Sequence, residues 1–312
     1  MGGSIKVKKE CMNNCKVANM LTVNKGLAKK QMIRVSTLPS RKIVTLVNLC
    51  QDKNIQLSCN DISPYDMAVM DAFYTLYKSG YQTFSLQTVI RVMSGNMDQD
   101  ITAQKIARLK ESVEKLRLIL ITIDCTDELR ARKLIKKEET AKYRSYFLPV
   151  SSMEIQSGNQ TVVEGYRLLE LPALYAYAER IKQMISVPIE LLASTEGFLP
   201  DTDENIVLKR YLLKRIARMK KEKATVYSRR IRYEWYDRKA QREKGMFAEL
   251  GYREEDFASR SSWLNKRAKV HKVVKQILDA FRQAGYIAGY SETREGNTIT
   301  GVEILLGETT EK

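Results

Sequence analysis

Residues 262–305 have the sequence SWLNKRAKVHKVVKQILDAFRQAGYIAGYSETREGNTITGVEIL. The first part has apolar residues at helical spacing and ends at Gly285. The second part alternates in two runs, Tyr286–Ser291 and Thr298–Leu305, around the turn signal Glu-Gly-Asn. This stretch predicts a long helix capped by Ser262 and then a β-hairpin. The buried stripe of the helix would comprise Val270, Val273, Val274, Ile277, Leu278 and Phe281.

The opposite face of this helix is almost wholly cationic or amide. Lys and Arg donate to guanine edges or phosphates, and Asn and Gln pair with adenine. We therefore expect the first turns to read DNA in the major groove. Arg267 would lie at the flank, and Ser262, Arg294 and Asn297 would hold phosphates or the minor-groove edge. The base-reading candidates are Asn265, Lys266, Lys269 and Lys272.

The residues before this stretch supply two further expected helices. Asp203 opens one with an apolar side and an opposite row of cations, which would contact the DNA backbone or face solvent. Ser228 can cap a second helix that runs through Ile231 and Trp235, with Phe247, Leu250 and Gly251 further on where the segment closes. Three helices followed by a hairpin are typical of a winged helix. The row of cations on the first helix is Arg210, Lys214 and Arg218.

The first half of the chain has the same order of elements. Ser63, Ser85 and Thr102 can each cap a helix, and strands are expected at Leu118–Ile123, Tyr143–Val150 and Thr161–Glu170. Residues 130–137 would form a basic wing tip. The exposed edge of Leu118–Ile123 is a candidate dimer surface. The outer face of the third helix, which is less basic, would present Gln104, Lys105, Arg108 and Ser112 to DNA.

The predicted fold class is α+β and mostly helical, with two tandem winged-helix domains and a basic N-terminal arm. The arm would cover residues 1–58, and we expect residues 1–42 to be disordered or only weakly helical. The remaining boundaries are a first winged helix at 59–170, a helical connector at 171–202, a second winged helix at 203–307 and a tail at 308–312.

Charge is distributed unevenly along the 312 residues. With 53 Lys and Arg against 37 Asp and Glu, the formal net charge is +16. Residues 1–50 hold 10 basic and 1 acidic residue, 203–244 hold 15 and 6, and 259–282 hold 7 and 1. Local positive potential of this kind favours a polyanion such as DNA, although lysine-rich helix faces are also common in soluble proteins.

Several classes of site are not expected. The five cysteines are scattered without a CxxC pair, which predicts neither a disulfide framework nor a zinc site. No Gly-Lys-Ser/Thr phosphate loop is present. The lone His271 excludes paired-histidine nucleases, and Val274 replaces the arginine of a recombinase His-x-x-Arg motif. We expect no catalysis, no metal, no cofactor, no membrane span and a cytoplasmic location.

Over about residues 60–307 the chain resembles iteron-binding plasmid replication initiators, which are two winged helices in tandem. The residues that carry the resemblance are LKRYLLKRI at 208–216 and ILDAF at 277–281, which continues to Gly285-Tyr286-Ile287. The resemblance implies that the C-terminal winged helix reads origin repeats, and that the N-terminal one contacts backbone and dimerises. It also implies a monomer–dimer equilibrium and host replication proteins as partners.

Two other functions remain open. A dimeric winged-helix repressor would use the same parts, because fold does not determine function. An initiator would occupy direct repeats as monomers, whereas a repressor would occupy one inverted repeat as a dimer. An RNA-binding protein is the third possibility, and Tyr233, Trp235 and Tyr236 are the aromatic residues that could support it.

Overall fold

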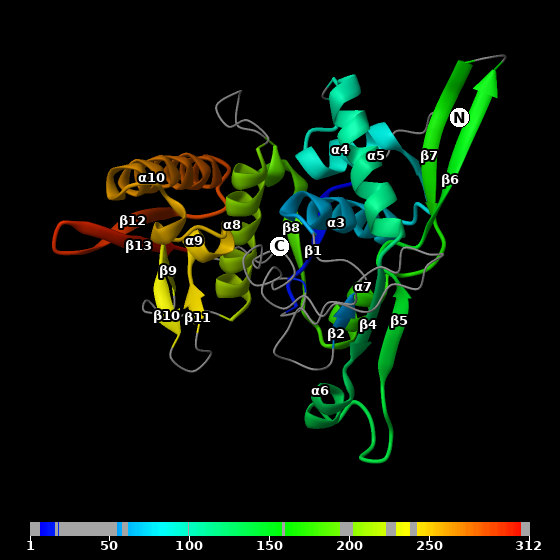
Figure 1. The fold of residues 1–312 in the computed structure, drawn as a ribbon, viewed down its shortest axis with the longest axis horizontal. Coiled ribbons are helices and arrows are strands. Elements are labelled where there is room, and N and C mark those ends of the chain that lie inside the picture. The colour runs from blue at the N-terminus through cyan, green and yellow to red at the C-terminus, as the bar shows by residue number, and fades with distance from the viewer. Residues whose placement is uncertain are drawn as a thin grey trace. The chain divides into compact units, whose positions relative to one another are not determined.

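The computed structural model describes residues 7–15, 18, 55–57, 62–98, 100–157, 160–193, 202–222, 229–237 and 242–306 (Figure 1). The chain forms two compact units, Met1–Ser186 and Val187–Lys312. Their boundary lies inside the predicted connector. Both units mix helices with two- or three-stranded sheets. The tail at 308–312 and most of the N-terminal arm lie outside the described residues.

Three helices form the core of the first unit: α3 (Pro64–Lys78), α4 (Leu86–Ser94) and α5 (Ala103–Arg117). Each begins at its predicted cap, because the side chains of Ser63, Ser85 and Thr102 accept hydrogen bonds from backbone N–H groups in the first turn. Phe73, Val89 and Val113 are fully buried, one from each helix.

The hairpin of this unit is β6 (Val150–Ser157) and β7 (Gln160–Leu168). A three-residue strand between the first two helices, β3 (Thr83–Ser85), pairs antiparallel with β7, so the sheet order is β3-β7-β6. The sequence predicted the β7 region but not β3. It also placed the hairpin one strand too early.

The segment predicted as a basic wing is instead a separate lobe. It comprises β4 (Leu120–Asp124), α6 (Thr126–Ala131) and β5 (Lys142–Tyr146). β4 lies between β2 (Ile55–Leu57) and β5, and Ile121–Ile123 are paired on both sides, so the prediction of an exposed edge is wrong for these residues. Residues 130 and 131 end α6 and residues 132–137 follow it, so this segment is not the tip of a continuous hairpin.

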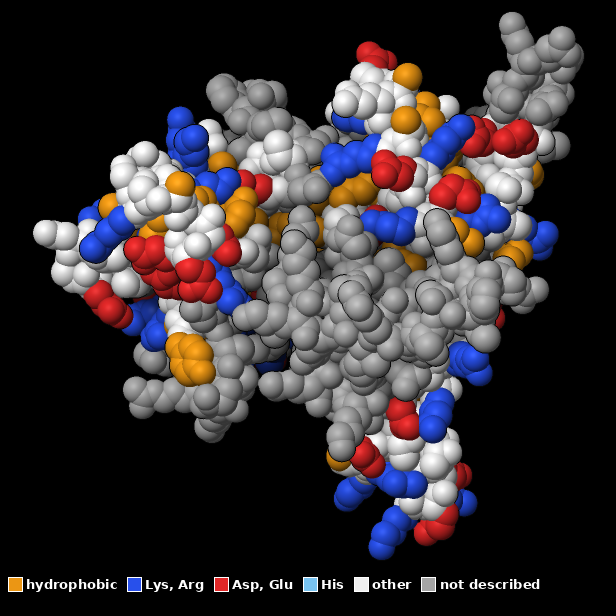
Figure 2. Space-filling view, in the orientation of Figure 1, with side chains coloured by type: hydrophobic (Ala, Val, Ile, Leu, Met, Phe, Trp, Pro, Cys, Tyr) orange, Lys and Arg blue, Asp and Glu red, His pale blue; other side chains and the backbone are white. Residues whose placement is uncertain are grey.

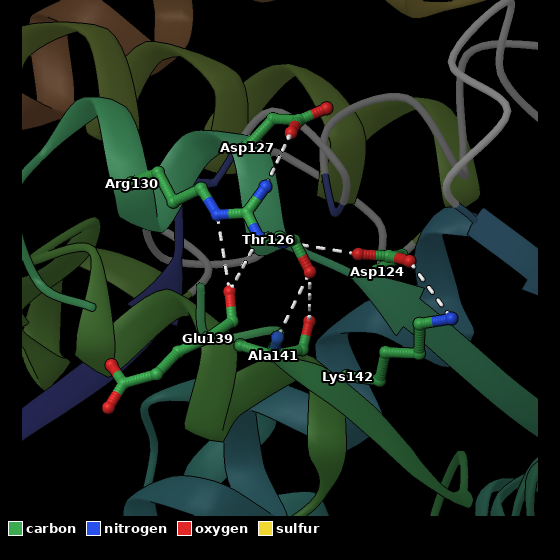
Figure 3. A network of polar contacts seen from close by, with 7 residues as sticks. All are labelled: Asp124, Thr126, Asp127, Arg130, Glu139, Ala141 and Lys142. Atoms are coloured by element: carbon green, nitrogen blue, oxygen red, sulfur yellow. Dashed lines mark hydrogen bonds and ion pairs between the residues drawn. The ribbon is translucent and has the colours of Figure 1, made fainter. Parts of the chain in front are cut away.

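Hydrogen bonds hold α6 against the strands of this lobe (Figure 3). Thr126 bonds to both the N–H and the carbonyl of Ala141, at 3.0 and 3.4 Å. The Arg130 guanidinium donates to the carbonyl of Glu139 at 2.8 Å. Lys142 pairs with Asp124 at 3.3 Å. These contacts therefore hold α6 in a fixed orientation on the strands of the lobe.

Part of the predicted N-terminal arm is a buried strand, β1 (Lys9–Asn13). It pairs with β8 (Met184–Pro188), which follows α7 (Ala173–Arg180). Met12 and Cys15 are fully buried, and the Asn13 N–H donates to Asp71 at 2.9 Å. The expectation of a disordered or weakly helical arm is wrong for residues 7–15, because alternate side chains of this strand complete the core of the unit.

The second unit has a corresponding set of elements. After the turn η1 (Ile189–Leu192), the principal helices are α8 (Asp203–Lys221), α9 (Met246–Glu249) and α10 (Arg260–Gln283). The strands are β9 (Arg230–Arg232), β10 (Trp235–Asp237), β11 (Arg242–Lys244), β12 (Gly289–Glu295) and β13 (Thr298–Leu305). The turn η3 (Glu254–Asp256) precedes α10.

Two expectations for this unit are wrong. The predicted second helix from Ser228 is not formed through Ile231 and Trp235, which lie in strands β9 and β10, and Ser228 itself lies outside the described residues. The cap of α10 is Ser259 rather than Ser262, which is the third residue of a capping box with it. Both Ser259 and Ser262 fit a cap by residue type, so the sequence alone does not distinguish them.

The two units repeat one arrangement: helix, short strand, two helices and a hairpin whose second strand pairs with the short strand. The sheet orders are β3-β7-β6 and β9-β13-β12. Gly165 and Gly301 occupy matching positions, where a Cβ would lie 2.6 Å from the Phe84 carbonyl oxygen and 2.5 Å from the Ile231 carbonyl oxygen. Each glycine permits the short strand to approach the hairpin closely.

Candidate nucleic-acid interface

Helix α10 packs one face into the second unit and leaves the other in solvent. Val270, Val274 and Phe281 are buried on the inner face. At the N-terminal end, Trp263 is buried and packs against Phe247, with ring centroids 5.0 Å apart. The predicted inner stripe is confirmed except that Val273 is only half-buried. The outward face is therefore set by the packing of the whole helix.

Asn265, Lys269 and Lys272 lie on that outward face and are all exposed. Their spacing of four and three residues places them in one row along the helix. No side-chain hydrogen bond or ion pair to any of them is found within the part of the chain that the structure describes. Their polar groups are available to a ligand.

Lys266 and Arg267 were predicted to touch DNA, but both have partners inside the protein. Lys266 Nζ lies 2.5 Å from Glu204 Oε2 and over the ring of Tyr252. Burial alone would lower the pKa of Lys266, but its bonds to Glu204 and Tyr252 outweigh burial and raise that pKa. Lys266 therefore stays charged and links α10 to the start of α8 through Glu204.

Arg267 lies between the core and a neighbouring loop. Its Nη1 is 2.8 Å from Glu234 Oε1, and its guanidinium lies over the rings of Phe247 and Trp263. Its side chain is only 15% exposed. We conclude that Arg267 holds α10 against the loop between β9 and β10.

His271 lies beneath the row of exposed cations. Its ring packs at a tilt against Tyr233, with centroids 4.0 Å apart, and its buried Nε2 has no hydrogen-bond partner within the described residues. Burial, then the Arg267 charge, lowers the pKa of His271 to about 4. The imidazole is neutral at pH 7, so it packs in the core and adds no charge to the surface.

The hairpin β12–β13 carries the remaining candidates of this unit. Arg294 is exposed and pairs with Glu292 at 2.7 Å, while Asn297 is exposed at the turn. Lys275, half-exposed on α10, also pairs with Glu292, at 3.1 Å. Lys275 is not among the predicted DNA contacts, although its position three residues after Lys272 places it on the same helix face.

The cations of α8 do not form the open row that the sequence suggested. Arg210 is 7% exposed and Lys214 is half-buried, whereas Arg218 pairs with Glu222 at 2.8 Å. The prediction of an outward Arg210 is wrong. Leu213 is fully buried as well as Leu212, so the helix is covered on more than one side.

In the first unit, the corresponding helix α5 has little available charge. Gln104 is exposed, Lys105 is half-buried and Arg108 lies 3.9 Å from the centroid of the Tyr65 ring. Ser112 is buried and donates to Asp66 at 2.5 Å, so its predicted contact with DNA is wrong.

Two other cations of α5 are also paired. Lys110 pairs with Glu164, and Lys115 pairs with Asp66 at 2.5 Å. Together with the partners of Arg108 and Ser112, these contacts leave α5 much less suited to DNA than α10.

Exposed aromatic side chains of the second unit lie on β10. Trp235 and Tyr236 are exposed, but Tyr233 is buried. Adjacent residues of a strand point to opposite faces, so Trp235 and Tyr236 do not form one stacking platform. This arrangement does not favour the RNA-binding alternative.

Neither a metal-binding cluster nor a membrane-spanning helix is found among the residues that the structure describes. Among these residues, no group of three or more His, Cys, Asp or Glu side chains is placed to hold a metal ion. None of the helices described is long and apolar enough to cross a membrane.

No family model and no curated protein matches this chain. Among solved structures, it is similar to a crystal structure of domains 2 and 3 of RctB, with 12% identity and a TM-score of 0.41, covering 89% of this chain and 96% of that one. A second crystal structure of RctB domains 2–3 has 10% identity and a TM-score of 0.40, covering 88% and 90%. Values this low assign no role to any side chain, so the roles depend on the geometry above.

Proposed function

We propose that the protein is a sequence-specific double-stranded DNA-binding protein without catalytic activity. Each unit is a winged helix, and α10 enters the major groove. The observation that carries the proposal is the exposed row of Asn265, Lys269 and Lys272, whose polar groups have no partner in the described chain.

The dimensions of α10 suit this task. A helix with its side chains is about 10–12 Å wide, and the major groove is about 12 Å wide. Residues 265 and 272 are about 10 Å apart along the helix axis at 1.5 Å per residue. Asn265 can pair with adenine and Lys269 with guanine, while Lys272 can reach a phosphate. Arg294 and Asn297 on the hairpin supply flanking contacts.

The role proposed for this binding is replication initiation at repeated sites of a plasmid or mobile element, with host replication proteins as further partners. This role rests on the resemblance of residues 208–216 and 277–287 to iteron-binding initiators. A dimeric repressor is the alternative, because it would present the same helix to DNA.

We further propose that the first unit mediates homodimer formation through an apolar patch instead of a strand edge. Leu118 and Leu169 are 69% and 62% exposed. Leu120 and Tyr146, also exposed, are paired across β4 and β5. Their segments adjoin, because the Phe147 N–H donates to the Ile119 carbonyl and the Ser145 hydroxyl donates to Glu170. Exposed apolar side chains on adjoining segments are typical of interaction surfaces. We call these four residues the apolar patch.

Selection of genomic fragments at about 150 mM salt tests the DNA-binding proposal, because nonspecific phosphate affinity is weak there. The parent protein should enrich a defined sequence. Lys269→Ala combined with Lys272→Ala should abolish the enrichment. Lys8→Ala combined with Lys9→Ala removes the same charge from exposed positions near or on β1 and should leave the enrichment intact.

The pattern of the enriched sites distinguishes the two roles. Tandem direct repeats beside an AT-rich tract would support an initiator, whereas a single palindrome would support a repressor. Absence of any enriched sequence would refute sequence-specific binding. Equal loss with both lysine pairs would refute the assignment of reading to α10.

A further inference from the structure

Five of the helices that the structure describes end with the same backbone geometry. The second residue past the helix has a positive φ, and the N–H of the residue after it donates to the carbonyl five residues back, as in a Schellman motif. In α3, α9 and α10 the positive-φ residue is Gly80, Gly251 or Gly285. In α6 and α7 it is Lys133 or Lys182, each with φ +56°.

Lysine is an unexpected residue at this position. The left-handed region costs free energy for a residue with a Cβ, and glycine avoids this cost. Every other positive-φ residue in the described chain is glycine. A Cβ at Gly80, Gly251 or Gly285 would meet nothing within 4 Å, so the backbone conformation, and not lack of space, accounts for glycine there. Lys133 and Lys182 therefore retain side chains at a cost.

These two lysines lie at helix ends that contact each other. Arg132 Nη1 donates to the carbonyl of Ile181, and Arg180 Nη2 donates to the carbonyl of Leu134, each at 3.4 Å. Tyr177 of α7 also donates to Glu128 of α6. These reciprocal contacts bring four cations together at one place: Arg132, Lys133, Arg180 and Lys182. We call this group the lysine-arginine patch.

The acidic groups next to the patch are already engaged. Glu128 accepts from Arg132 at 2.9 Å and from Tyr177. Glu179 pairs with Lys78 at 2.7 Å and accepts from Tyr74. Lys133 and Lys182 are exposed, with no ion pair found among the described residues. The surface of the first unit thus keeps a net positive charge here.

The patch is also held in place before any ligand binds. α6 is fixed to its strands by the contacts in Figure 3, and α7 packs on β4 and β5. Lys and Arg side chains are visible over the end of the lobe that carries α6 (Figure 2). A fixed base carrying flexible lysines suits a ligand recognised by its charge, such as a row of phosphates.

We propose that the lysine-arginine patch binds the phosphate backbone of double-stranded DNA independently of sequence. The identity of the ligand rests on the proposed DNA-binding function. The site is distinct from α5 and the β6–β7 hairpin, and it uses the inserted β4–α6–β5 lobe, for which the second unit has no counterpart between α10 and its hairpin.

The test replaces both lysines by glycine, Lys133→Gly with Lys182→Gly, in the full chain. Glycine suits the backbone, so the melting temperature should stay the same or rise. Binding to a labelled duplex of arbitrary sequence should weaken at low salt. Loss of two phosphate contacts should reduce by about 2 the steepness with which log affinity falls with log salt. The ratio of the parent's affinity to the variant's should therefore fall roughly tenfold between about 50 and 200 mM salt.

The variant Lys133→Arg with Lys182→Arg is the matched control, because it keeps both charges and both β-carbons. It should bind as the parent does. The proposal is overturned if the glycine variant binds DNA with the parent's affinity and salt slope. A lower melting temperature with unchanged DNA binding would show that the lysines only stabilise the helix ends.

The duplex assay and the selection of genomic fragments together distinguish failure of this proposal from failure of the proposed function. If the parent itself binds no DNA, both are refuted. If the parent binds and Lys269→Ala with Lys272→Ala abolishes its sequence preference, but the glycine variant is unchanged, only the role of the lysine-arginine patch is refuted.

Discussion

Lys266 and Lys269 lie one turn apart on α10 but have different surroundings. Lys266→Ala leaves the half-buried Glu204 carboxylate without its cation, so we expect a loss of about 1–2 kcal/mol in the free energy of unfolding. Lys269→Ala changes an exposed side chain and should alter stability by less than about 0.5 kcal/mol. Urea denaturation measures both values.

The effects of the same two substitutions on DNA binding should come in the reverse order. Lys269→Ala should cost about 1–3 kcal/mol of discrimination for its preferred base. Lys266→Ala should have little effect once the protein is folded. An equal loss of sequence preference in the two variants would show that Lys266 leaves Glu204 to contact DNA.

His271 makes stability depend on pH in a defined direction. Burial lowers its folded-state pKa to about 4, below the unfolded value of about 6.5, so the unfolded chain binds more protons between these values. The charged groups that face the ring are Arg267, Lys275 and Glu292. Stability from this site is complete above about pH 6.5 and is lost as the pH falls towards 4.

The variant His271→Phe keeps an aromatic ring against Tyr233 and cannot be protonated. We expect its stability relative to the parent to increase as the pH is lowered from 7 to about 5. Thermal unfolding of both proteins across this range measures the difference. A constant difference would mean that the parent imidazole does not titrate as expected.

The sequence predicted which face of α10 is buried because that face is apolar, and it failed where a buried side chain is polar. Ser112 lies three residues after Leu109 and four before Leu116, which places it on the buried stripe of α5. Residue type suggested the outer face instead. Its hydroxyl is satisfied by Asp66, a partner 46 residues away that no local pattern reveals.

At the scale of elements, strand β1 shows that a basic segment can be part of the core. We expect Asn13→Ala to lower the free energy of unfolding by about 1–3 kcal/mol, because the side chain donates to the buried carbonyl of Leu174 at 3.1 Å. Denaturant unfolding of this variant tests the role. Lys8→Ala, at an exposed position next to β1, is the control and should be nearly neutral. A neutral Asn13→Ala would contradict a structural role for the strand.

Helix starts were predictable and the short strands were not, for a physical reason. Caps such as Ser63 and Thr102 act on backbone groups two or three residues away, so their signal is local. Strands β3 and β9 have three residues each and are defined by pairing with β7 and β13. The pairing partners lie about 70–80 residues away in sequence, which is also why the first hairpin was assigned to the wrong strands.

At the scale of the whole chain, the repeated arrangement is used differently by the two units. In α5 the cations Lys110 and Lys115 are neutralised by Glu164 and Asp66, whereas Lys269 and Lys272 of α10 stay available. One fold can therefore present a reading helix in one copy and a mainly structural helix in the other. The inserted lobe then gives the first unit cations that its own third helix does not offer.

The apolar patch of the first unit makes a prediction about assembly. Leu118→Glu with Leu169→Glu places charges on two exposed leucines, which should weaken self-association without unfolding the protein. Sedimentation velocity over a range of concentrations should show a monomer–dimer equilibrium in the parent and monomers in the variant. Leu305→Glu, an exposed leucine of the second unit, is the control and should dimerise as the parent does.

The same variant connects assembly to the type of DNA site. An initiator that occupies direct repeats as monomers would keep, or increase, its occupancy of those repeats when dimers are lost. A repressor would lose occupancy of its palindrome, because two linked half-sites bind more tightly than either one alone. If the parent protein stays monomeric at every concentration, the proposed dimer is refuted. Direct repeats would then be the favoured arrangement, because separate monomers can each place α10 in one repeat.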